Sequence, residues 1–248
     1  MALRIAGQEI EVPKSDEALV FAVENGQWSC RGPRSTVVLT GKRPGLQGPI
    51  DDAFTAPFLC VRGTGKAWNP AVQAWASASL RRFEYEWARY MRGDLPVKND
   101  TDVTAADVQD KHLILFGDPG SNSWIAKALP QLPVKWTADT LSFGNANYSA
   151  SAHAPAFLCA SPLATNRYLV INSGHTFHEQ EFAAFNYLLF PRLGDWSIVK
   201  IGPGADNWQP TASAFPEEVI RAGYFDEAWQ KPVLEDHNSG RQRPVQAE

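Results

Sequence analysis

This chain contains a serine, a histidine and an aspartate that together could form the catalytic triad of a serine-type hydrolase. Ser121 follows a short apolar run and lies where a helix should begin, so its hydroxyl could attack a carbonyl while backbone N–H groups hold the oxyanion. His175 follows another apolar run, and an ordinary histidine pKa of about 6.5 suits a general base. Asp52 could orient that imidazole. We therefore predict Ser121 as nucleophile, His175 as base and Asp52 as the orienting acid.

Each of these residues also has a purely structural interpretation. Serine and asparagine are favoured N-caps, so Ser121 or Asn122 could simply satisfy the first turn of the helix. A histidine in a loop often only hydrogen-bonds backbone, and an aspartate in a turn such as Pro49-Ile50-Asp51-Asp52 commonly accepts from nearby N–H groups. Polar residues around the three are predicted to contact the substrate: Asp118, Asn122, Asp51, Arg62 and Thr176.

A metal ion is the other chemistry that the histidines suggest. His178 shares a helical face with His175 if a helix has begun there, and the pair then has the spacing of a metal motif. The third ligand would have to be Glu179 or an acid from another loop, so we predict no metal. The segment Arg62-Gly63-Thr64-Gly65-Lys66 lacks the spacing of a phosphate-binding loop, and we predict no cofactor.

Three apolar runs must position these residues, and each stops at a glycine-containing polar turn. If the strands are parallel, the side chains of these turns meet at one edge of the sheet. Ligands of parallel sheets bind in the crevice beyond the carboxyl ends of the strands. The runs and the turns that follow them are Phe58-Leu59-Cys60-Val61 with Arg62-Gly63-Thr64-Gly65, Leu113-Ile114-Leu115-Phe116 with Gly117-Asp118-Pro119-Gly120-Ser121-Asn122, and Tyr168-Leu169-Val170-Ile171 with Asn172-Ser173-Gly174-His175-Thr176.

Strand and helix patterns alternate from Phe58 to about Ile201, which predicts parallel strands joined by helices. We therefore expect an α/β fold: a mostly parallel three-layer sheet, Rossmann- or flavodoxin-like, with a small N-terminal antiparallel β appendage at 1–40. The α/β domain would span 41–230, and 231–248 would be a disordered tail. Helices are predicted at Pro70 to Met91, from near Ser121 to before Pro130, and at Gln180 to Leu189; further strands at Leu19 to Val23, Thr36 to Leu39, Val134 to Trp136, Ala156 to Cys159 and Trp196 to Ile201; and a capping box at Thr104 and Asp107.

The composition argues against several classes of function. The 23 basic and 27 acidic residues give a net charge of -4, which disfavours a nucleic-acid partner. No window reaches the ~20 apolar residues of a membrane span, and no signal peptide is evident, so we expect a soluble protein, whether cytoplasmic or exported. Cys60 and Cys159 lie in apolar runs and should be buried free thiols.

Five ordered motifs run through the chain: Lys42-Arg43-Pro44-Gly45-Leu46-Gln47-Gly48-Pro49-Ile50-Asp51-Asp52-Ala53-Phe54, Val97-Lys98-Asn99-Asp100-Thr101-Asp102-Val103-Thr104, Gly117-Asp118-Pro119-Gly120-Ser121-Asn122, Asn172-Ser173-Gly174-His175-Thr176-Phe177 and Gly223-Tyr224-Phe225-Asp226. Together they resemble the C-terminal region of large bacterial prolyl-oligopeptidase-like or α/β-hydrolase-like serine hydrolases, over about residues 3 to 230. The resemblance implies a hydrolase context, linked to polysaccharide or ester breakdown, but the Gly-x-Ser-x-Gly elbow of those enzymes is absent here.

Two functions follow as hypotheses. The first is hydrolysis of ester bonds in a small molecule or a polysaccharide, by a serine-type carbohydrate or short-chain esterase. The second is a non-catalytic accessory domain that docks on an α/β-hydrolase or binds carbohydrate. The nine tryptophans should mostly pack in the core, although one or two near the site could stack on a sugar ring.

Overall fold

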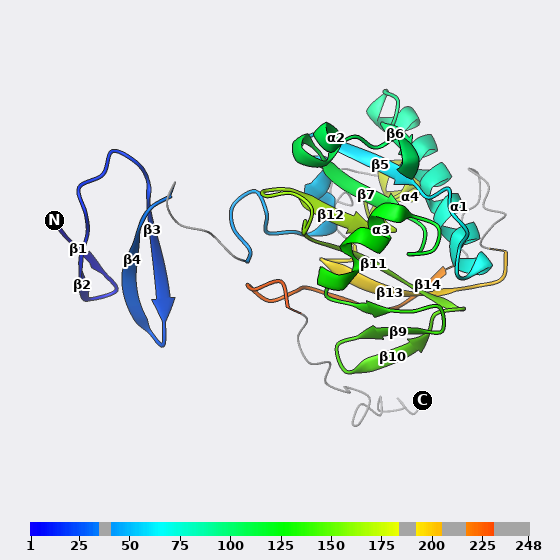
Figure 1. Cartoon of the computed structure of the whole chain (residues 1–248). Coiled ribbons are helices and arrows are strands. Elements are labelled where there is room, and N and C mark those ends of the chain that lie inside the picture. The colour runs from blue at the N-terminus through cyan, green and yellow to red at the C-terminus, as the bar shows by residue number, and fades with distance from the viewer. Residues whose placement is uncertain (35–40, 184–191, 205–216, 231–248) are drawn as a thin grey trace, which may run out of the picture. The chain divides into compact units, whose positions relative to one another are not determined.

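The computed structural model describes residues 1–34, 41–183, 192–204 and 217–230 (Figure 1). The chain divides into two compact units, Met1–Thr40 and Gly41–Glu248. The strand predicted at 36–39, the second half of the helix predicted at 180–189 and the tail from 231 onward lie outside the described residues.

The first unit consists of two β-hairpins. The turn of the second hairpin contains Asn25 and Gly26, both at positive φ (51° and 77°), which is the geometry that Asn-Gly adopts in tight hairpins. The residues that pair with the strand predicted at Leu19 to Val23 directly follow this turn. The paired strands are β1 (Ala2–Ile5) with β2 (Gln8–Glu11), and β3 (Leu19–Glu24) with β4 (Gln27–Pro33).

The second unit is built on a seven-stranded sheet in the order β14-β13-β11-β12-β7-β5-β6. The pairs β12–β7, β7–β5 and β5–β6 are parallel. The pairs β12–β11, β11–β13 and β13–β14 are antiparallel. The strands are β5 (Phe58–Arg62), β6 (Val97–Asn99), β7 (His112–Phe116), β11 (His153–Ala160), β12 (Tyr168–Ile171), β13 (Trp196–Ile201) and β14 (Glu217–Gly223).

The prediction of a mostly parallel three-layer sheet is wrong. The sheet is mixed, because only residues 161–167 join β11 to β12, and so short a connection can only reverse the chain into an antiparallel pair. Apolar runs reveal a buried strand but not its direction. The helical layers are also thin, since α1 (Pro70–Glu86) is 17 residues long whereas α2 (Ala105–Asp110), α3 (Ser123–Ala128) and the described part of α4 (Glu179–Ala183) have five or six.

The remaining elements are short and confirm several local predictions. The capping box of Thr104 and Asp107 is present at the start of α2, and α1 continues into a single π-helical turn, Trp87–Met91. A separate three-stranded sheet contains the predicted strand near Trp136. Its strands are β8 (Lys135–Trp136), β9 (Thr140–Phe143) and β10 (Ala146–Ser149), and the 3-10 turns are Ile50–Phe54, Asp100–Asp102 and Leu129–Gln131.

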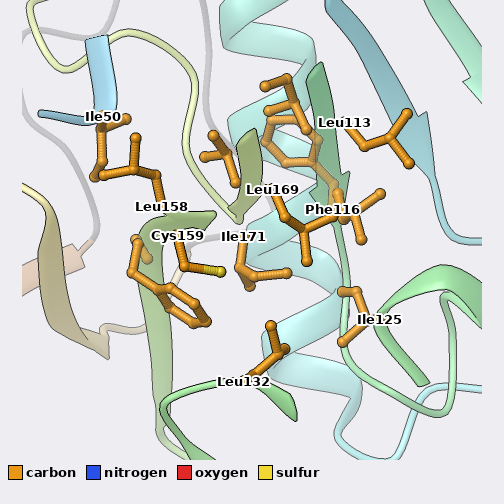
Figure 2. Packing of buried hydrophobic residues seen from close by; sticks show 14 of the residues in the cluster. Ile50, Leu113, Phe116, Ile125, Leu132, Leu158, Cys159, Leu169 and Ile171 are labelled. Atoms are coloured by element: carbon orange, nitrogen blue, oxygen red, sulfur yellow. The ribbon is translucent and has the colours of Figure 1, made fainter. Parts of the chain in front are cut away.

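The core of this unit surrounds the central strands (Figure 2). All residues of β7 and β12 are buried, because neighbouring strands and packed elements cover both faces, as expected for parallel strands with continuous apolar sequences. The apolar residues of α1 form a buried stripe, with Val72, Trp75 and Phe83 at most 3% exposed. Within the described ranges, no helix combines the length and apolarity that crossing a bilayer demands.

Candidate functional site

The three predicted loops do meet, because β5, β7 and β12 are parallel neighbours whose carboxyl ends share one edge. The Gly117 N–H donates to Asn172 Oδ1 at 2.8 Å, and Asn172 Nδ2 donates to the Gly117 carbonyl at 2.9 Å. The Gly65 N–H donates to the carbonyl of Ser121 at 2.8 Å. The loops are therefore tied to one another directly through hydrogen bonds.

The loop after β7 uses its polar side chains to hold its own backbone. Asp118, which has no exposed surface, accepts from the N–H groups of Asn69, Gly120 and Ser121 at 2.9–3.0 Å. The Ser121 hydroxyl accepts from the Asp118 N–H at 2.9 Å and is also fully buried. A nucleophile at Ser121 would therefore require this loop to open.

Asn122 is the N-cap of α3. Its Oδ1 accepts from the N–H groups of Trp124 and Ile125, at 3.1 and 3.4 Å. Its amide Nδ2 donates to the carbonyls of Val61 and Phe116, so the side chain also links α3 to β5 and β7. The capping interpretation is confirmed for Asn122 rather than for Ser121.

Asp51 and Asp52 face different partners. Asp51 accepts from the N–H and the hydroxyl of Thr176, at 2.7 and 2.6 Å; burial raises the pKa of Asp51, and these hydrogen bonds oppose the rise. Asp52 accepts from the Tyr168 hydroxyl at 2.5 Å. Asp51, not Asp52, is thus the acid that contacts the loop of His175.

Arg62 lies on the surface, half exposed, and pairs with Glu84 at 3.4 Å. The three residues predicted as a triad make no hydrogen bond with one another: Ser121 bonds to Asp118, Asp52 to Tyr168 and His175 to Phe177. The structure thus brings the predicted residues into two groups. Ser121, Asp118 and Asn122 share one loop, and Asp51 and Thr176 lie beside His175.

A cavity of about 380 Å³ opens beside the loop after β12. Residues of this loop line it together with α1, β13 and β14. Two ion pairs stand in its wall, Arg82–Glu217 at 3.2 Å and Arg192–Glu181 at 2.5 Å. The other polar and aromatic lining residues are Trp75, Ser79, Asn172, Ser173, His175, Thr176 and His178.

His175 is the most unusual of these lining residues, being 3% exposed and enclosed by aromatic rings. Its ring stacks on Phe177 and makes a T-shaped contact with Phe83, with ring centroids 4.9 and 4.8 Å apart. Its Nδ1 lies 2.7 Å from the Phe177 carbonyl, which can only accept, so Nδ1 carries the proton. The Nε2 atom is buried and has no hydrogen-bond partner within the described part of the chain. Burial lowers the pKa of His175 to about 4, although the charge of Glu86 opposes this, and the ring is neutral at pH 7.

His178 and Glu86 stand next to His175. His178 Nδ1 lies 3.0 Å from Glu86 Oε2, and Glu86 is 1% exposed. Burial and then the charge of Arg82 lower the pKa of His178 to about 3. Two neutral imidazoles and a carboxylate therefore lie together at the C-terminal end of α1.

The residues that α1 contributes to this site were not among those predicted from the sequence. Trp75, Ser79, Arg82 and Glu86 recur every three or four residues, which places them on one helical face. Serine, arginine and glutamate with at most 9% exposure form a polar stripe beside the apolar one. That spacing was a readable signal, because charged residues are rarely buried without a partner.

Comparison with family models, with curated proteins and with solved structures finds no significant match to this chain. The resemblance to large bacterial serine hydrolases stays a prediction.

Proposed function

We propose that this protein binds a small hydroxylated ligand of the carbohydrate type in the cavity beside β12. The observation that carries the proposal is the composition of the cavity wall, where the Arg82–Glu217 and Arg192–Glu181 pairs supply both hydrogen-bond donors and acceptors to a cavity of about 380 Å³. This volume falls within the range of about 300–1,000 Å³ usual for small-molecule sites. Sugar hydroxyls both donate and accept, so they match such a mixed wall.

Trp75 adds an aromatic surface to this wall. It is 3% exposed, and its buried indole Nε1 has no hydrogen-bond partner in the described ranges. An unpaired buried N–H costs about 1–3 kcal/mol, which an oxygen of a ligand would offset. Sugar binding without turnover suits an accessory role beside a separate hydrolase.

The test is a thermal-shift and calorimetric titration of the purified chain with mono- and disaccharides and their acetylated forms. A ligand at a hundred times its Kd should stabilise the fold by about 2.7 kcal/mol, seen as a rise in Tm. Val219 lies at the cavity and is 46% exposed, whereas its neighbour Ile220, 37% exposed, does not line it. Val219→Trp should abolish the shift and Ile220→Trp should keep it. Absence of a shift with every sugar, or an equal shift in both variants, would refute the proposal.

Ester hydrolysis is the second candidate, favoured by the unpartnered Nε2 of His175 in the cavity wall. The neutral imidazole could take a proton from water as the water oxygen attacks an acyl carbon, and return it to the departing alcohol. Hydrolysis of p-nitrophenyl esters should then fall by about 10²–10⁴-fold in His175→Gln and persist in Ser121→Ala. Equal rates in the parent and His175→Gln would remove this candidate.

A further inference from the structure

Glu86, His175 and His178 form the only group of three potential metal ligands found among the described residues. One nitrogen or oxygen from each lies within 4.8 Å of the others. Glu86 ends α1 where the π-helical turn begins, and both histidines follow β12. A π-helical turn in an α-helix frequently accompanies a functional site.

The free nitrogen of His175 is the observation that points to a ligand. Its Nδ1–H is fixed by the Phe177 carbonyl at 2.7 Å, which leaves a lone pair on Nε2 with no hydrogen-bond partner among the residues that the structure describes. Histidines that bind metals characteristically donate their other N–H to a carbonyl or carboxylate, which fixes the tautomer and the ring. An ordinary hydrogen bond is enough to explain the contact of His178 with Glu86. It does not explain why His175 Nε2 is buried without a partner among the described residues.

The spacing of the other two groups suits a tetrahedral ion. Glu86 Oε2 and His178 Nδ1 are 3.0 Å apart, close to the roughly 3.3 Å between ligand atoms that bond lengths of about 2.0–2.1 Å imply. To bind through Nδ1, His178 moves its proton to Nε2, the other tautomer of neutral imidazole. The ligand atoms lie within 4.8 Å of one another, so the remaining separations shorten by at most about 1.5 Å, from 4.8 to about 3.3 Å, when an ion binds.

We propose that Glu86, His175 and His178 bind a divalent transition metal ion of the zinc class. Two imidazoles and one carboxylate are a donor set that zinc accepts, with a fourth position left open. Both histidines line the cavity, which gives the ion a path of entry. Glu217 and Glu181 balance the nearby charges of Arg82 and Arg192.

The experiment is a titration of the chelator-treated full chain with Zn²⁺ by calorimetry and with Co²⁺ by visible absorption, with Mg²⁺ as the hard-cation control. We expect one Zn²⁺ per chain, an intense Co²⁺ spectrum typical of four ligands, and no binding of Mg²⁺. These titrations of the parent protein are a sufficient test. If it neither binds Zn²⁺ stoichiometrically nor gives a tetrahedral Co²⁺ spectrum, the proposal is refuted.

Variants then assign the ligands. Glu86→Gln and His178→Gln should each weaken Zn²⁺ binding by at least about 10- to 100-fold, the loss usual even for residues that only support a metal ligand. His175→Gln should do the same, with folding checked by circular dichroism. His153→Gln is the matched control, because His153 lies at the start of β11 with Nδ1 on the Ser149 carbonyl. Equal affinity in parent and variants would place the ion elsewhere and refute the site. No sugar enters these titrations, so the proposed function can fail or succeed independently.

Discussion

Asn172 and Gly117 exchange two hydrogen bonds between loops that are 55 residues apart in the sequence. The Gly117 N–H and carbonyl both bond to the Asn172 side chain, at 2.8 and 2.9 Å. Asn172 is 2% exposed and has a φ of 51°, a conformation that asparagine tolerates better than most residues. This one side chain therefore ties the end of β7 to the loop that forms the cavity wall.

Two substitutions of Asn172 should distinguish what its hydrogen bonds contribute to the free energy of unfolding from what its backbone strain costs. Asn172→Ala leaves two buried backbone groups of Gly117 unpaired and should lower the free energy of unfolding by about 2–4 kcal/mol. Asn172→Gly loses the same bonds but accepts the positive φ, so it should be about 1 kcal/mol less damaging. Urea denaturation of the two variants measures both quantities. Equal stabilities would show that the φ of 51° costs alanine nothing.

Ser121 should matter for stability and not for ligand binding. Ser121→Ala leaves the buried Asp118 N–H without its acceptor at 2.9 Å, which should cost about 1–2 kcal/mol of unfolding free energy. Sugar binding and any ester hydrolysis should stay at the parent level, with the exposed Ser151→Ala as a control for both assays. A folded Ser121→Ala protein that loses all esterase activity would restore the serine-type mechanism.

Lys42 and Asp195 form a buried ion pair at 2.6 Å, with side chains 11% and 0% exposed. Burial raises the pKa of Asp195, and the Lys42 ammonium opposes the rise. Lys42→Met leaves the carboxylate without its cation and should cost about 3–5 kcal/mol. Adding Asp195→Asn should recover part of that loss, and Lys200→Met, on the surface, should cost little. Chemical denaturation of the double-mutant cycle gives the coupling; strictly additive losses would mean that the pair contributes no interaction of its own.

His112 should make stability depend on pH. Its Nδ1 accepts from the Tyr168 N–H at 3.0 Å, and burial, followed by the charge of Arg167, lowers its pKa from 6.5. The unfolded chain therefore takes up the proton first as the pH falls, and stability that is fully present above about pH 6.5 declines toward the folded pKa.

The comparison with His112→Asn isolates this effect, because asparagine can keep the acceptor without the titration. Between about pH 7.5 and about pH 5, the parent should lose up to about 1.4 kcal/mol per pH unit more than the variant. Denaturation curves across this range give the two slopes. Parallel slopes would mean that His112 protonates equally in both states.

The local pattern of apolar and polar residues was enough to predict the positions of several strands and helices. The apolar runs at 58–61, 113–116 and 168–171 are strands of one sheet. The stripe that begins at Val72 is on α1, and Thr104 with Asp107 caps α2. These features depend on neighbours within a few residues, so the sequence carries them.

The tertiary structure alone decided the direction of β11 and β13 and the partners of each polar side chain. Glu86 meets His178 across 92 positions, and Lys42 meets Asp195 across 153. Ser121 likewise forms its hydrogen bond with Asp118 and not with His175. Such contacts depend on how packed elements bring distant segments together and on which buried groups need a partner, and no spacing within the sequence encodes that outcome.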